Sequence, residues 1–293
     1  MLAVKSALKY YIGHARNPQH LPRFDMEKPS TELLVAEEAA RAAGAITRKK
    51  FGELSGKEIH PKEFRDFVTE TDKACEAEIE RIIKAAFPRD GMLCEEGTTA
   101  PPLSGRTWIV DPLDGTLNFI HSFPVFSISI ALKDEAEGLT HGVVYQPVLD
   151  ELFTARKGRG AYLNGRRINV ADRREDDGWL IATGLPFKEY HYMDAYMAML
   201  KDVVKVSAGI RRAGSAAIDL AYTACGRFDA FWEYVLFPWD FSAGVLLVRE
   251  AGGTVTDFTG EDDVFRRRSI IAGNPETHPL LLTMARKHFP EAE

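Results

Sequence analysis

A short apolar stretch that runs straight into two acidic residues constrains the fold of this chain more than any other feature. Trp108–Val110 consists of bulky and β-branched residues, which are typical of a buried strand. Pro112 and Gly115 then interrupt the pattern, so Asp111 and Asp114 are predicted at the strand end and in the loop after it. Ligands of open α/β structures usually bind at such strand ends, and the stretch therefore predicts a ligand site.

Two interpretations of these acids are open. Pro-x-Asp-Gly is an ordinary turn sequence, in which an Asp side chain often bonds its own backbone. Two hard oxygen donors three residues apart, with Gly115 and Thr116 beside them, also suit a divalent cation that holds a phosphate. The rest of the chain has to decide between the two.

Composition excludes several classes of protein. A net charge of −6 argues against a nucleic-acid binder or a basic membrane-surface protein. The 3 cysteines are too few and too scattered for a disulfide framework, which favours a reducing, cytoplasmic setting. No apolar run approaches the ~20 residues that span a bilayer.

The 293 residues can hold one large domain or two smaller ones, and the predicted elements change in character near residues 172–177. We expect an α+β half over residues 31–175 and an α/β half over residues 176–293. Residues 1–30 form a basic extension with no acid before Asp25. A transit peptide can look like this, but an arm or helix that packs on the fold or on a partner is the favoured interpretation.

The first half is predicted to begin with two helices, one from Thr31 and one after Thr71 as its cap, and to continue with strands. These strands are Thr107–Val110, Phe126–Leu132, Gly142–Tyr145 and Leu152–Ala155. The second half alternates strands and helices. Its strands are Trp179–Thr183, Phe228–Tyr234, Gly253–Phe258 and Ser269–Ala272, and its helices are Met193–Val204, Ser215–Ala224, Phe241–Ala251 and Pro275–Lys287.

Further acids fall at the ends of apolar elements. Asp72, Glu95 and Asp240 each have an ordinary explanation as a helix-start or solvated loop residue. If Glu95, Asp240 and the first two acids meet, each pair of charges ~4 Å apart repels by roughly 4 kcal/mol at an effective dielectric of ~20. Such a cluster implies bound cations, and its all-oxygen donors favour Mg²⁺ or Mn²⁺ over Zn²⁺.

Four separated blocks in order carry a resemblance to a known family. They are Asp66–Lys73, Glu95-Glu96, Trp108–Phe119 and Trp239–Gly244 leading into Glu250–Gly253. With these blocks, the chain resembles the inositol monophosphatase family of lithium-sensitive, Mg²⁺-dependent sugar phosphatases from about Thr31 to Phe289. The resemblance implies a layered αβαβα fold, a mixture of α+β and α/β character, with the site between its two halves and often a homodimer.

The resemblance also assigns roles to residues at matching positions. The implied ligands of two or three Mg²⁺ ions, with Mn²⁺ as an alternative, are Glu95, Asp111, the Leu113 carbonyl, Asp114 and Asp240. The implied catalytic residues, which orient and deprotonate a metal-activated water, are Asp72, Glu95 and Thr116. The residues implied to bind substrate are Leu113, Asp114, Gly115, Thr116, Gly214, Ser215, Ala216, Glu233 and Asp240, and Arg212 is expected near the substrate or a dimer edge.

The expected activity is Mg²⁺-dependent hydrolysis of inositol 1-phosphate to inositol and phosphate. Fructose 1,6-bisphosphate, histidinol phosphate and 3′-phosphoadenosine nucleotides are alternative substrates. The resemblance implies the same metals and water for all of them, and the sequence does not resolve the specificity of the lip formed by Gly214–Ala216, Arg212 and Glu233. The haloacid dehalogenase type of phosphatase fits poorly, since Asp111 and Asp114 are three apart instead of two. A scaffold that acts through protein or RNA partners is the non-enzymatic alternative, although the chain is expected not to bind nucleic acid strongly.

Overall fold

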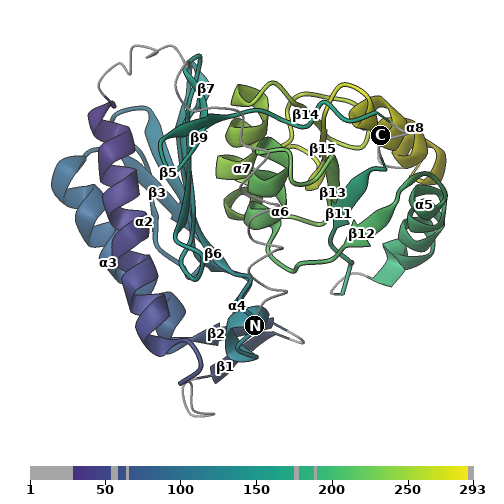
Figure 1. Cartoon of the computed structure of the whole chain (residues 1–293). Coiled ribbons are helices and arrows are strands. Elements are labelled where there is room, and N and C mark those ends of the chain that lie inside the picture. The colour runs from purple at the N-terminus through teal and green to yellow at the C-terminus, as the bar shows by residue number, and fades with distance from the viewer. Residues whose placement is uncertain (1–28, 54–58, 64–65, 175–177, 188–189, 290–293) are drawn as a thin grey trace, which may run out of the picture. The chain divides into compact units, whose positions relative to one another are not determined.

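The computed structural model describes residues 29–53, 59–63, 66–174, 178–187 and 190–289. Residues 31–293 form one compact unit, and the architecture below is that of this unit (Figure 1). The predicted N-terminal extension lies almost entirely outside the described residues. Among the described residues, no helix is both long enough and apolar enough to cross a membrane.

The larger of two main sheets has eight strands in the order β10-β9-β8-β7-β6-β5-β3-β4. Neighbouring strands run antiparallel except for β3 and β5, which are parallel. The strands are β3 (Gly91–Cys94), β4 (Thr99–Ala100), β5 (Arg106–Asp114), β6 (Ser127–Asp134), β7 (Gly138–Gln146), β8 (Glu151–Arg156), β9 (Gly160–Leu163) and β10 (Arg166–Ile168).

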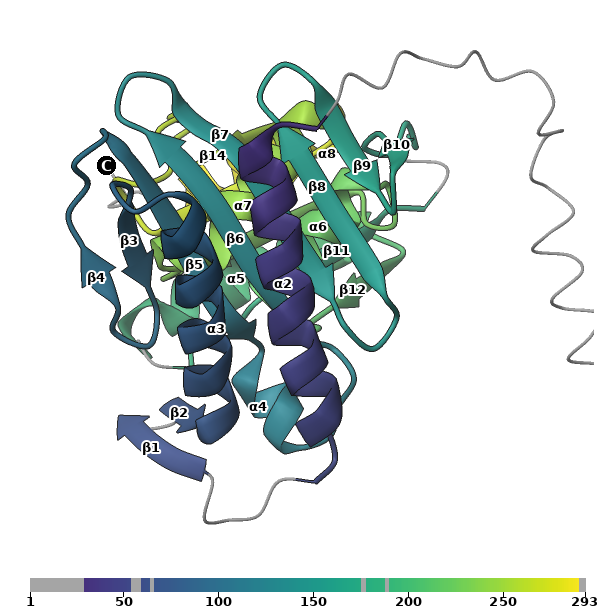
Figure 2. The ribbon, with the colours of Figure 1, turned by 90° about the vertical axis from the view of Figure 1, so that its left-hand side faces the viewer.

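Two long helices cover one face of this sheet, as Figure 2 shows. They are α2 (Thr31–Lys50) and α3 (Glu70–Ala86), which follows a small hairpin of β1 (Ile59–Glu63) and β2 (Asp66–Thr69) that the sequence did not predict. Small residues of α2 such as Ala36 and Ala40 pack with Ile79 and Ile83 of α3. Burying these apolar stripes against the sheet is what stabilises both helices.

The cap of α3 corrects a prediction. Thr69 begins the helix instead of Thr71: its hydroxyl accepts from the backbone N–H groups of Thr71 at 3.1 Å and Asp72 at 3.4 Å. The Asp72 carboxylate accepts in return from the Thr69 N–H at 2.9 Å. This reciprocal capping box satisfies more unpaired N–H groups than a single Thr71 cap could, and it fixes the Asp72 side chain.

Strand β5 is longer than predicted and continues through both of its acids. Asp111 pairs with Ser129 and Asp114 with Ser127 of β6, so β5 holds one extra residue between them. This is a β-bulge, a place where a strand tolerates a residue such as Pro112 that cannot donate a ladder hydrogen bond. The acids therefore project from a bulged strand and not from a free loop. The short helix α4 (Thr116–Ile120) follows directly.

A middle layer of two helices separates the two main sheets (Figure 1). It consists of α6 (Ala216–Ala224) and α7 (Pro238–Glu250). Helix α7 begins three residues before the predicted Phe241, because Pro238 occupies its first turn, where a missing N–H costs nothing. Because helices cover both faces of the large sheet, successive side chains of β5 are buried on opposite faces. Ile109 packs toward α6 and α7, whereas Trp108 and Val110 pack toward α2 and α3.

The second main sheet has five strands in the order β12-β11-β13-β15-β14. Its strands are β11 (Leu180–Thr183), β12 (Gly209–Arg211), β13 (Ala230–Tyr234), β14 (Thr254–Thr256) and β15 (Ser269–Gly273). The three-residue β12 was not predicted. Helices α5 (Met193–Val206) and α8 (Thr277–His288) cover the outer face of this sheet. The short 3₁₀ helix η4 (Tyr190–Tyr192) directly precedes α5 in the chain. The layers thus follow the predicted αβαβα order, and the fold prediction is confirmed (Figure 1).

Candidate active site

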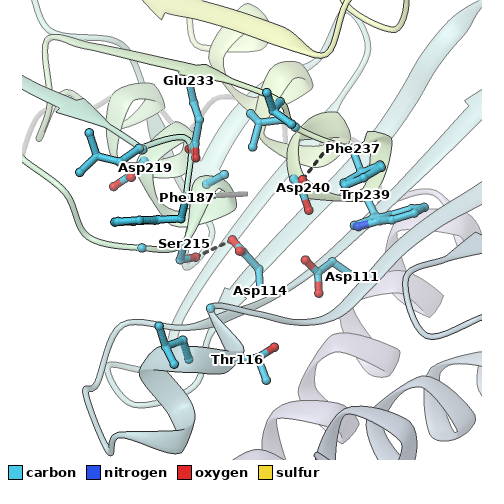
Figure 3. Close-up of a pocket in the computed structure, with 18 of the residues that line it drawn as sticks. Asp111, Asp114, Thr116, Phe187, Ser215, Asp219, Glu233, Phe237, Trp239 and Asp240 are labelled. Atoms are coloured by element: carbon cyan, nitrogen blue, oxygen red, sulfur yellow. Dashed lines mark hydrogen bonds between the residues drawn. The ribbon is translucent and has the colours of Figure 1, made fainter. Parts of the chain in front are cut away.

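One pocket gathers most of the predicted site residues. It opens where the end of β5 meets the first turns of α4, α6 and α7, and Figure 3 shows its acidic side chains. The predicted residues that line it are Glu95, Asp111, Leu113, Asp114, Gly115, Thr116, Gly214, Ser215, Ala216, Glu233 and Asp240. Asp72 lies behind this lining and is linked to it by Thr116. Both sheets and the helices between them therefore contribute to one site, while the chemical roles of these residues stay predictions.

Asp111 is almost fully enclosed, with 1% of its surface exposed. Its Oδ1 accepts from the Leu113 N–H at 3.0 Å, so the local backbone bond expected of an ordinary turn is present. Burial, followed by repulsion from Glu95, Asp114 and Asp240, raises the pKa of Asp111 well above its ordinary value. The turn bond and the acidic cluster therefore coexist, and the first does not exclude the second.

Asp114 links the bulged strand to α6. Its Oδ2 accepts from the Ser215 hydroxyl at 2.6 Å and from the Ala217 N–H at 2.8 Å, at the start of that helix. Burial raises the pKa of Asp114 to about 6, although the hydrogen bonds from Ser215 and Ala217 act in the opposite direction. The carboxyl group is thus fixed by two donors from the far side of the pocket.

Asp240 comes from the first turn of α7. Its Oδ2 accepts from the Phe237 N–H at 2.7 Å, which fulfils the helix-start role expected of an acid at that position. Burial and then the repulsion from Glu95 raise the pKa of Asp240 well above its ordinary value, and Asp114 adds to the effect. Helix capping aims this carboxyl group into the pocket.

The chemistry of these side chains fits a divalent cation, although they are not preassembled around one. Among the described residues, no three His, Cys, Asp or Glu side chains are already arranged to hold a metal ion. Asp111, Asp114 and Asp240 nevertheless line one pocket, where burial and then repulsion from neighbouring carboxyl groups raise their pKa values. Carboxylate oxygens are the ligands that Mg²⁺ and Mn²⁺ prefer, so these acids, with Glu95 after β3, suit such a cation once their side chains adjust.

A hydroxyl–carboxylate pair lies beside the acids. The Thr116 hydroxyl is 3.0 Å from Asp72 Oδ1 and 3.1 Å from the Leu113 carbonyl oxygen, either of which can accept its proton. Burial raises the pKa of Asp72, whereas the bonds from Thr69 and Thr116 lower it. A carboxyl group held in this way can take up a proton that is relayed through the Thr116 hydroxyl.

Glu233 lies at the opposite wall, at the end of β13 (Figure 3). Part of its surface faces the open pocket, but the protein around it raises its pKa to about 8, mainly through burial. Its carboxyl group keeps this position because residue 184 is glycine: a Cβ there would lie 1.7 Å from Glu233 Oε1, and the carboxyl group would have to move. Gly184 was not predicted as a site residue. The need for a glycine at this position follows from its contact with Glu233 alone.

Asp219 is a second acid that sequence reasoning missed. It lines the pocket from α6, with 1% of its surface exposed, and Arg212, which was expected near the substrate, lines the same wall. Burial and the charge of Glu233 raise the pKa of Asp219 well above its ordinary value. The available signal was a lone acid inside the otherwise apolar run Ala216–Ala224, where a charged side chain is costly unless it has a function.

The five layers and the acidic pocket between them define a protein of the layered sugar-phosphatase fold. A family model described as "Inositol monophosphatase family" matches residues 28–289, and the chain belongs to this family.

Three relatives illustrate the relationship. The Nus factor SuhB of Pseudomonas aeruginosa is 45% identical over 264 residues, which cover 88% of this chain and 97% of that protein. The crystal structure of the extragenic suppressor protein suhB from Bartonella henselae has a TM-score of 0.84 and 42% identity, and the match covers 88% of this chain and 99% of that one. The Thermotoga maritima IMPase has a TM-score of 0.81 and 33% identity, and its match covers 90% and 100% of the two chains.

Proposed function

We propose that this protein is a Mg²⁺-dependent phosphomonoesterase that hydrolyses inositol 1-phosphate to inositol and phosphate. One observation carries the proposal: acids from the end of β3, from β5 and from α7 face one pocket and raise one another's pKa. A cluster of this kind is costly for a folded protein unless cations neutralise it. Membership of the inositol monophosphatase family and likeness to an IMPase structure support it.

The residues divide into two groups in this proposal. Asp111, Asp114 and Asp240, with Glu95 and the Leu113 carbonyl, would hold the cations. Bound cations would supply neutralisation of the phosphate, a lower pKa of water and stabilisation of the leaving alkoxide. Charge stabilisation of this kind is usually the largest contribution to catalysis.

The second group of residues handles the proton of the attacking water and binds the substrate. The Thr116 hydroxyl would orient the attacking water and pass its proton to Asp72, with which it is already hydrogen-bonded. Backbone N–H groups around Gly115 and Thr116 would bind phosphate oxygens. Gly214, Ser215, Ala216 and Glu233, which face these groups across the pocket, would contact the sugar ring.

The decisive experiment measures phosphate release, with and without Mg²⁺, from inositol 1-phosphate, fructose 1,6-bisphosphate, histidinol phosphate and 3′-phosphoadenosine 5′-phosphate. Asp111→Asn removes one charge with little change in shape and serves as the matched loss-of-function variant. We expect inositol 1-phosphate to be preferred and the activity to fall by about 10²–10³-fold in the variant, the usual effect of removing one charge-stabilising group. Preference for another ester would keep the mechanism and change the substrate. No Mg²⁺-dependent release from any of them would reject the proposal.

The names of the relatives favour a second candidate, a role as a Nus factor. It agrees with the scaffold alternative, and it need not use the acidic pocket. Cells that lack the protein can be supplied with either the wild type or Asp111→Asn. Full restoration by the variant would support this role, whereas failure of a folded, normally abundant variant would make phosphatase chemistry the essential activity.

Oligomeric state and location also remain proposals. We propose a homodimer, which light scattering on the purified full chain would test, and a cytoplasmic location, which cell fractionation would test. We expect little direct nucleic-acid binding at a net charge of −6, so a Nus-type role would rest mainly on protein contacts.

A further inference from the structure

Asp219 is a buried acid with an oxygen that has no partner. Among the described residues, nothing donates a hydrogen bond to its Oδ1, and 1% of the residue's surface is exposed. Buried carboxyl oxygens are nearly always hydrogen-bonded, and an unpartnered one lowers the stability of the fold. An apolar residue would suit the interior of α6 better, so folding alone does not explain this side chain.

The residue that carries the unpartnered oxygen lines the pocket, at the wall where a substrate's organic part would be bound. Figure 3 shows the carboxyl groups of Asp219 and Glu233 close to one another at the pocket, beyond Ser215 and on the side away from Asp111. They come from different elements, α6 and β13. Gly184 leaves the space that the Glu233 carboxyl group occupies.

The charge of this wall selects for neutral donors. Asp219 and Glu233 both line the pocket there, and the cation whose charge acts on both of them is the Arg212 guanidinium, which also stacks over Phe187 at 5.0 Å. Arg268 lines the pocket as well, but it stacks over Phe237 at 4.3 Å. A second phosphate or a carboxylate on the substrate would be held against two acids by one cation. Hydroxyl groups, in contrast, can donate to carboxyl oxygens without bringing a charge into a buried place.

We propose that Asp219 is a specificity-determining residue that accepts a hydrogen bond from a substrate hydroxyl neighbouring the one bound by Glu233. The pair then recognises adjacent hydroxyls on a polyhydroxylated ring. It also disfavours substrates that carry a second anionic group at that position. This inference rests on the proposed phosphatase function and names the part of the substrate that the acidic cluster does not contact.

The test compares Asp219→Asn with wild type on inositol 1-phosphate and on p-nitrophenyl phosphate, which has no hydroxyl groups to bind. We expect the ratio of kcat/KM for the two esters to fall roughly tenfold or more, the factor that a hydrogen bond to a charged group is worth. The melting temperature should not fall, because the replaced carboxyl oxygen has no hydrogen bond to lose. Fructose 1,6-bisphosphate should become a relatively better substrate.

Asp229→Asn is the matched control. Asp229 is also buried, but its oxygens accept from the Arg173 guanidinium at 2.9 Å and from the Leu180 N–H at 2.8 Å, away from the pocket lining. Its replacement should lower the melting temperature and leave the ratio of the two esters unchanged. An Asp219→Asn variant that behaves in the same way would show that Asp219 is structural and overturn the proposal.

A binding measurement separates this inference from the proposed function. Calorimetry measures binding of free myo-inositol in the presence of Mg²⁺ and inorganic phosphate, with no turnover required. Weaker binding by Asp219→Asn would support the role of Asp219 even if wild type hydrolysed none of the esters. Active wild type with an unchanged ester ratio and unchanged myo-inositol binding in Asp219→Asn would leave the phosphatase intact and reject the role of Asp219.

Discussion

At the scale of single residues, the Thr116 hydroxyl has the most specific role to test. It is the link between the pocket and the Asp72 carboxyl group. Thr116→Val keeps the shape of the side chain and removes the hydroxyl, so we expect kcat to fall by about 10²–10⁴, the usual contribution of a positioned proton acceptor. Thr116→Ser restores the hydroxyl and should recover most of the rate. Equal rates in the serine and valine variants would remove the hydroxyl from the mechanism.

Gly184 gives a second prediction at the scale of single residues, because the effect of replacing it depends on one steric contact. A Cβ at this position would overlap the Glu233 carboxyl group. Gly184→Ala should therefore displace Glu233 and lower kcat/KM for inositol 1-phosphate about tenfold or more. Gly209→Ala, on the strand β12 that pairs with β11, is the control: its Cβ would meet the ends of two flexible side chains, Leu180 Cδ1 at 3.3 Å and Arg211 Nη1 at 3.6 Å, and both can move. Steady-state kinetics of both variants decide, and a fully active Gly184→Ala would contradict the geometry.

At the scale of elements, α3 holds the turn that carries Glu95. The buried Glu76 accepts from the backbone N–H groups of Glu96 at 2.8 Å and Thr98 at 3.0 Å. Helix and turn are thus fixed by one side chain, which makes Glu76 a positioning residue for Glu95.

We therefore expect Glu76→Ala to lower the free energy of unfolding by about 1–3 kcal/mol, because two backbone donors lose a charged acceptor. It should also weaken Mg²⁺ binding several-fold, as measured by calorimetry. On the same helix, Glu78→Ala removes only a surface ion pair with Arg81 and should change stability by less than about 1 kcal/mol. A loss of stability without any change in Mg²⁺ affinity would limit Glu76 to a structural role.

At the scale of the whole molecule, the acidic pocket couples stability to pH and to metal. Without metal, the folded protein raises the pKa of Asp114 to about 6 and raises the pKa values of Asp111 and Asp240 well above the ~3.9 of the unfolded chain. As the pH rises above ~4, the unfolded chain releases these protons first, so the free energy of unfolding falls.

Mg²⁺ binds the ionised carboxylates of the folded state and should offset this loss. Thermal unfolding should show a larger increase in melting temperature with Mg²⁺ at pH 8 than at pH 5.5. NaCl at the same ionic strength controls for screening, and Asp111→Asn should reduce the difference. An equal increase at both pH values would mean that these carboxyl groups do not bind the cation.

Local chemistry explains how far the sequence could predict the fold. The apolar stripes of α2 and α3, the buried strand around Trp108 and the alternation in the second half were predicted from periodicity. Boundaries failed where several residues act together: the Thr69–Asp72 capping box moved the start of α3, and Pro238 moved the start of α7. The three-residue β12 carries too short a pattern to be detected and exists because β11 provides an edge for it.

The sequence by itself determined which chemistry is available: acids at the ends of apolar elements, a Thr directly after the Asp-Gly of the first acidic motif, and four motif blocks in a family's order. Tertiary structure alone decided that Asp219 and Glu233 share a wall and that Gly184 leaves room for one of them. The physical reason is that periodicity and capping act within a few residues of chain. Distances between side chains on α6 and β13 depend instead on how the two sheets pack around the middle helices, which no local pattern encodes.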